Sequence, residues 1–157
     1  MSERTTVVTV QILKLGTAEM ARQEAIDRGG DPTEIEELGD GFVGKYAFRA
    51  VFPTPEPAVR FEAQMREYGL SAWRRLEPSA VLSWVGAHAS VHVAGMYSGG
   101  MLSRGFIERL DESHLRIVPP GGEPTEGDIV LIHDVVDIEL LAYPRQTSAD
   151  ATPGESA

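Results

Sequence analysis

The chain has 157 residues, which fits one domain or two very small ones. Hydrophobic residues make up 42% and charged residues 24%, the composition of an ordinary globular protein, which excludes a wholly disordered chain. The formal net charge is −10, so polyanions such as DNA and RNA, and anionic membrane surfaces, are repelled. Neither nucleic acid nor a membrane is therefore an expected partner.

Cysteine is absent from the chain, which removes disulfides, thiolate metal sites and cysteine nucleophiles together. The amino-terminal stretch MSERTTVVTVQIL lacks the long apolar run of a secretory signal. No segment approaches the ~18 consecutive apolar residues of a membrane span. We therefore expect a soluble protein of the cytoplasm.

The first part of the chain alternates strand and helix patterns. Residues 5–15 are rich in β-branched side chains and predict a strand, and residues 17–28 predict a helix that ends at a Gly-Gly pair. The sequence DPTE at 31–34 has the acid, proline and glutamate spacing of a helix start. It predicts a short helix over 31–38.

A second strand and helix follow, with stronger patterns. Residues 42–52 alternate as a strand, and Thr54 with Pro55 predicts the start of a helix. One face of that helix carries Ala58, Phe61, Met65 and Tyr68. Residues 70–76 alternate as a further strand, so the segment predicts a βαβ or split-βαβ element.

The rest of the chain reads as β-structure cut by glycine-rich turns. Residues 79–87 are apolar and fit either a buried strand or a short helix. Strands are predicted over 90–97, 101–110, 114–118 and 129–143. Gly105 inside the second of these indicates a bulge or a close approach of backbone. The last strand has apolar residues on both faces, so it needs cover from another layer or another chain.

The stretch GGMLSRGFIERLDESHLRIV, followed by GDIVLIHDVVDIEL, resembles the strongly bent strands of the small Sm-like barrels. The likeness covers about a third of the chain and lies in the turn positions. It implies the shape of a small, curved barrel. The RNA-binding residues of that family have no counterparts in this stretch.

The predicted fold class is α+β. Residues 1–86 form a strand and helix region with a split-βαβ element packed on a mostly antiparallel sheet, and residues 87–143 form a curved all-β region resembling a small β-barrel. The tail 144–157 has no core-forming residues and is predicted to be disordered.

Three histidines are candidate metal ligands. His88 and His92 are four residues apart and so share a face of a strand or of a helix. Zinc or iron needs at least one further ligand, for which His133, Asp134 and Asp137 are the candidates, with His114 as another. The structural interpretation of the same pattern is a surface strand that presents its polar residues to solvent.

Asp134 lies on the otherwise apolar even face of the predicted last strand. A buried carboxylate there has to be paired or neutral, and would suit a general acid or base. The structural alternative is a β-bulge near His133 that turns Asp134 outward. We favour the bulge.

No catalytic signature is present. The glycine-rich YSGGMLSRG lacks the strand, loop and helix context of a phosphate loop, and a Gly-x-Ser-x-Gly elbow is missing. The sequence therefore predicts a non-enzymatic interaction, regulatory or assembly protein that uses its β-region, without a cofactor, and whose partner is another protein or a second copy. The alternative is a small metal-dependent enzyme or metal-binding protein that uses the histidines.

Overall fold

The computed structural model describes residues 4–39, 44–95, 100–123 and 126–141. The chain divides into two compact units, Met1–Ser83 and Trp84–Ala157, called here unit 1 and unit 2. Each unit is considered by itself. The tail 144–157, which the sequence predicts to be disordered, lies outside the described residues.

Unit 1 is built on an antiparallel sheet. Its strands are β1 (Thr6–Ile12), β2 (Asp31–Pro32), β3 (Glu36–Glu37), β4 (Tyr46–Phe52) and β5 (Ser71–Leu76). The order is β2-β4-β1-β5, and β3 also pairs with β4. The chain runs from β4 through a helix to β5, yet β1 lies between those two strands, which is the split-βαβ arrangement.

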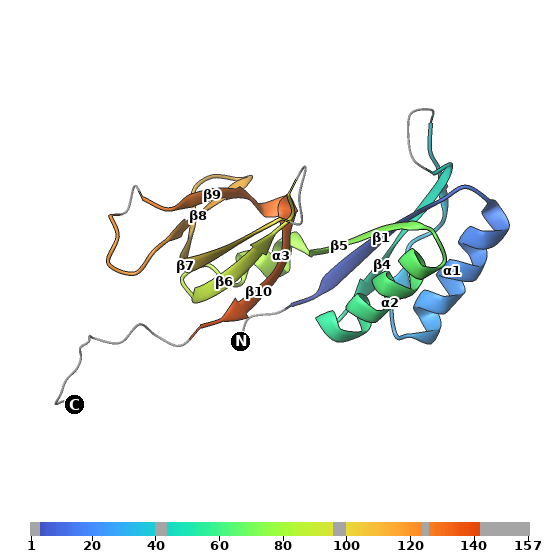
Figure 1. Ribbon diagram of the computed structural model, residues 1–157, viewed down its shortest axis with the longest axis horizontal. Coiled ribbons are helices and arrows are strands. Elements are labelled where there is room, and N and C mark those ends of the chain that lie inside the picture. Colours follow the sequence, from blue (N-terminus) through green and yellow to red (C-terminus); the bar gives the residue numbers. More distant parts are fainter. Residues whose placement is uncertain (1–3, 40–43, 96–99, 124–125, 142–157) are drawn as a thin grey trace. The chain divides into compact units, whose positions relative to one another are not determined.

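Two helices cover one face of this sheet, α1 (Leu15–Asp27) on β4 and α2 (Pro55–Glu67) on β1 and β5 (Figure 1). Alternate residues of β1 face them and are buried: Thr6, Val8, Val10 and Ile12. A short third helix, α3 (Pro78–Leu82), follows β5. The ambiguous apolar stretch 79–87 is therefore helical in its first part.

The helix predicted after Thr54 is confirmed, since α2 begins at Pro55. Its predicted stripe is buried at Ala58, Phe61 and Met65, whereas Tyr68 is exposed. The Phe61 ring centroid lies 5.5 Å from that of Phe52 and 6.5 Å from that of Phe48. These three aromatic rings join the helix to the sheet.

The short helix predicted over 31–38 is wrong, because this segment forms the edge strands β2 and β3. The backbone N–H of Thr33 donates to the Arg49 carbonyl, and the Arg49 N–H donates to the Thr33 hydroxyl. Hydrogen bonds to β4 therefore satisfy the backbone of this segment, and it stays extended instead of forming a helix. The helix predicted over 17–28 is present as α1, but it begins two residues earlier, at Leu15.

Unit 2 is a five-stranded antiparallel sheet of order β10-β6-β7-β8-β9. Its strands are β6 (His88–Val93), β7 (Met101–Arg109), β8 (His114–Val118), β9 (Asp128–Leu131) and β10 (Val135–Leu140). The inner face carries its core, which is aliphatic: Ala89, Val91, Ile107, Leu115, Ile117, Val130 and Ile138. The four predicted strands are all present, although the last is divided.

Two glycines permit close backbone approaches in unit 2. A Cβ on Gly105 would overlap the Val118 carbonyl, and one on Gly127 would overlap the Ile117 carbonyl, so only glycine permits these backbone approaches. The Ser103 hydroxyl donates to the Asp128 carboxylate at 2.6 Å, which links β7 to β9 across β8. In the described residues, however, β9 and β10 do not pair, so a closed barrel is not found and the likeness to Sm-like barrels is unconfirmed.

The single strand predicted over 129–143 is wrong. A turn of 3-10 helix, Ile132–Asp134, separates β9 from β10. The two strands pair with β8 and β6 respectively, at opposite ends of the sheet order, so a straight strand cannot make both pairings. The chain has to turn between them.

The described residues thus form an α+β protein with three α-helices and two antiparallel sheets. Among them, no helix has the length and apolar character needed to cross a membrane.

Candidate functional site

His88 occupies a structural position in β6. Its side chain is 9% exposed, and its ring stacks on Phe106 with the centroids 4.8 Å apart and the planes at 30°. His88 and Phe106 lie opposite each other in the pairing of β6 with β7. Packing against the Phe106 ring therefore accounts for the buried position of the His88 side chain.

His92 lies four residues further along the same face, beside a hollow of about 320 Å³ on the outer face of the sheet. Asp137 of β10 and Leu102 of β7 are its cross-strand neighbours. The hollow is lined by Ser90, His92, Leu102, Arg104, Asp137, Glu139 and Leu141. We call it the β6 hollow.

The β6 hollow carries charges of both signs, since Arg104 faces the carboxylates of Asp137 and Glu139 across β6. Such a lining can both donate to and accept from a polar ligand. Ser90 and His92 share it, but no hydrogen bond joins them within the described residues, so the geometry of an activated serine is not present.

His133, the third predicted metal ligand, is exposed in the 3-10 turn rather than on a strand. Across the four described stretches, no group of three or more His, Cys, Asp or Glu side chains is placed to hold a metal ion. A metal site at His88, His92 and His133 therefore stays a prediction.

Asp134 is half-buried and ends the 3-10 turn. The pairing of β10 with β6 shifts register between Val135 and Asp137, where the sequence analysis favoured a bulge near His133. The irregularity accounts for the two consecutive buried residues, Val135 and Val136, at the start of this strand. Asp134 is thus a turn residue at the start of β10.

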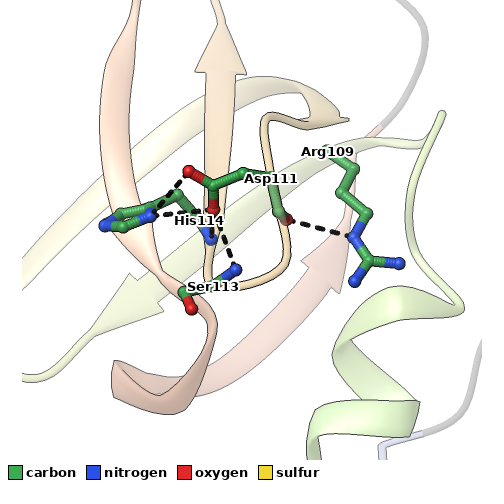
Figure 2. Close-up of polar contacts among 4 residues, drawn as sticks. All are labelled: Arg109, Asp111, Ser113 and His114. Carbon is green, nitrogen blue, oxygen red and sulfur yellow. Dashed lines mark hydrogen bonds and ion pairs between the residues drawn. The ribbon is translucent and has the colours of Figure 1, made fainter.

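The turn between β7 and β8 holds a polar cluster that the sequence analysis did not identify (Figure 2). The Asp111 carboxylate accepts hydrogen bonds from the backbone N–H groups of Ser113 and His114, each at 2.8 Å, and from Nδ1 of His114 at 2.9 Å. Arg109 donates to the Asp111 carbonyl at 3.1 Å. The bonds from His114 and from the Ser113 backbone lower the pKa of Asp111 below its ordinary value of 3.8.

The edges of the two sheets differ in how their backbone groups are satisfied. In an antiparallel strand, every second residue directs its N–H and C=O toward a given neighbour. The Glu77 N–H donates to the Thr5 carbonyl, so the odd-numbered residues of β5 bond to β1. Ala72 and Arg74 therefore direct their backbone groups away from β1. The Ala72 carbonyl accepts from Arg66 Nε at 2.9 Å, and the Arg74 carbonyl accepts from Arg75 Nη1 at 2.8 Å. Guanidinium groups therefore occupy this edge.

The opposite edge of unit 1 is protected in a similar way. Arg22 Nε donates to the Thr33 carbonyl at 2.9 Å. The strands there have two residues each and include Pro32, Glu36 and Glu37. Short length, proline and charge are the common means of preventing an edge strand from pairing with another chain.

The β10 edge of unit 2 is capped at one position, the Ile138 N–H. The bond from the Leu141 N–H to the His88 carbonyl shows that Ile138 directs its backbone groups away from β6. The Ile138 N–H donates instead to the carboxylate of Asp137 at 2.8 Å. Glu139 adds a second negative charge to this edge.

The β9 edge is different. The Ile132 N–H donates to the Ser113 carbonyl, so the even-numbered residues of this segment bond to β8. Ile129 and Leu131 therefore direct their backbone N–H and C=O groups away from β8. Their side chains are 52% and 42% exposed. In the described part of the chain, no side chain caps these outward groups. We call Ile129, Leu131 and their outward backbone groups the β9 edge.

Comparison with known families, curated proteins and solved structures finds no match to this chain. Among the described residues of unit 2, the β6 hollow and the β9 edge are both accessible from outside.

Proposed function

We propose that the protein is a non-enzymatic interaction or assembly protein of the cytoplasm, which binds a protein partner or a second copy through its carboxy-terminal β-region. The observation that carries the proposal is the β9 edge. Its backbone groups point outward and its side chains Ile129 and Leu131 are exposed and apolar. Addition of a strand to such an edge gives main-chain hydrogen bonds for affinity and apolar pairs for specificity.

The contrast with the other edges supports this use. The side chains of Arg66, Arg75 and Asp137 each bond one outward backbone group on another sheet edge, and Arg22 bonds the Thr33 carbonyl beside β2. An apolar edge whose outward groups lack such bonds is a candidate docking strand. The net charge of −10 disfavours nucleic acid and favours another protein as the partner.

The test compares the wild-type protein with Ile129→Lys/Leu131→Lys as baits in affinity capture. The control Leu13→Lys/Met20→Lys makes the same charge change at side chains of unit 1 that are each 71% exposed. We expect proteins retained by wild type and control to be lost from the β9 variant, or wild type and control to self-associate where the β9 variant does not. Equal behaviour of all three proteins would contradict the proposal.

A further inference from the structure

We propose that the occupant of the β9 edge is the β9 edge of a second copy, the two strands pairing antiparallel about a two-fold axis. This inference rests on the proposed function and specifies its partner. The pairing would join two five-stranded sheets of unit 2 into one continuous sheet.

The positions of the outward groups select the register. Only Ile129 and Leu131 point their N–H and C=O groups outward, so these residues must form the hydrogen-bonded pairs. Placing Ile129 opposite Leu131 of the second copy uses both residues of both chains. The two-fold axis then passes between the two Val130 residues, and the junction contains two Ile–Leu pairs on one face of the sheet.

The charges beside β9 suit this register. Asp128 is the acid of the strand, and it lies opposite Ile132 of the second copy rather than opposite the other Asp128. The two carboxylates are then four residues apart along the junction, about 13 Å at the rise of a strand. That distance exceeds the Debye length of about 8 Å at physiological ionic strength.

The side chains of the neighbouring strand β8 also suit this register. Arg116 lies beside Ile129 and His114 lies beside Leu131 in the pairing of β8 with β9. Each Ile–Leu pair is therefore bordered by Arg116 of one chain and His114 of the other, and the nearest carboxylates, Glu108 and Asp111, lie one position further from the junction beside these two residues. A head-to-tail contact between β9 and the β10 edge is less favourable, because Asp137 occupies the Ile138 N–H there and Glu139 adds charge.

The experiment is sedimentation velocity of the full chain over a wide concentration range. We expect a monomer–dimer equilibrium that shifts toward dimer as salt is raised, because two chains of charge −10 repel each other. In Ile129→Lys/Leu131→Lys dimerisation should weaken at least about tenfold. The variant Ile129→Thr/Leu131→Thr keeps strand propensity without adding charge and should weaken it too, whereas Leu13→Lys/Met20→Lys should not.

The register has its own test, because the chain contains no cysteine. Cα atoms of a hydrogen-bonded pair are about 5.5 Å apart, within disulfide range. On mixing Ile129→Cys with Leu131→Cys, we expect oxidation to give mainly the mixed dimer. Equal or greater linkage within either variant alone would overturn the register.

Two outcomes would overturn the inference itself: a wild type that stays monomeric at all concentrations, and association that persists in both β9 variants. If the wild type is monomeric but captures proteins that the β9 variant loses, the proposed function stands and the second copy is the wrong partner. If capture also fails to depend on β9, both proposals fail.

Discussion

The sheet edges of unit 1 and unit 2 differ in how often side chains bond to their backbone groups, and the two units also differ in their content of Lys and Arg. Unit 1 holds ten of the fourteen Lys and Arg residues; Arg66 and Arg75 donate to outward carbonyls of the edge strand β5, and Arg22 donates to the Thr33 carbonyl beside β2. Unit 2 holds all four histidines and few arginines. A long guanidinium that satisfies a carbonyl also blocks a strand from pairing there. The comparison suggests that unit 1 is protected against strand addition while one edge of unit 2 is left accessible.

The two cores also differ. Unit 1 closes its sheet with helices and buries Phe48, Phe52 and Phe61 together with Met65. Unit 2 buries mainly aliphatic side chains together with Trp84, and Gly105 and Gly127 permit close backbone approaches to β8. A cluster of mutually packed aromatic rings therefore distinguishes the core of unit 1, whereas unit 2 contains positions that only glycine can occupy. Substitutions in each unit test this difference.

The largest effect is expected for Phe61→Ala in unit 1. Phe61 is fully buried between Phe48 and Phe52, so truncation removes a ring and leaves a cavity. We expect a loss of about 3–5 kcal/mol in the free energy of unfolding, measured by urea denaturation. Val59→Ala, on the exposed side of the same helix, should change it by less than about 0.5 kcal/mol. A loss below about 1 kcal/mol for Phe61→Ala would show that α2 contributes little to the core.

An intermediate effect is expected for Gly105→Ala in unit 2. The added Cβ would overlap the Val118 carbonyl, which is backbone and cannot move without disturbing the pairing of β7 with β8. We expect a loss of about 2–4 kcal/mol in unfolding free energy. The control Gly39→Ala adds a Cβ with no atom within 4 Å and should be nearly neutral. If the two variants have equal stability, the close approach does not require glycine.

Local patterns predicted those parts of the fold that local forces determine. The Thr54-Pro55 start and the stripe at Phe61 and Met65 predicted α2, and alternation predicted β8 over 114–118. The break at residues 132–134 could not be predicted in this way. Val130, Ile132, Val136 and Ile138 are all buried, so the alternation continues across the turn, and the pairing of β9 and β10 with distant strands imposes the break.

The candidate site was predictable only in part. Apolar residues on both faces of the predicted last strand indicated a need for cover, and the exposed Ile129 and Leu131 agree with that indication. The contacts that block the other edges join side chains to carbonyls of other segments, as Arg22 does with Thr33. Residue types and spacing do not specify such contacts, because they depend on which strand ends at an edge.

The smallest effect is expected in the turn of unit 2 that Asp111 organises. Its pKa is lowered in the folded state, first by the hydrogen bond from His114 and next by the backbone N–H of Ser113, so the ionised carboxylate stabilises the fold above the ordinary pKa of 3.8. That contribution is lost as the pH falls below 3.8 and through the lower, folded-state pKa. Asp111→Asn should therefore lower the Tm at neutral pH, and the difference from wild type should narrow in acid.

Thermal unfolding measured from neutral pH to below pH 3.8 checks this expectation. The control is Glu112→Gln, which removes an exposed negative charge from the adjacent position of the same turn. It should leave the Tm nearly unchanged at every pH. A difference for Asp111→Asn that stays constant with pH would mean that the shape of the side chain, and not its charge, holds the turn, because only an ionised carboxylate gives stability that depends on protonation.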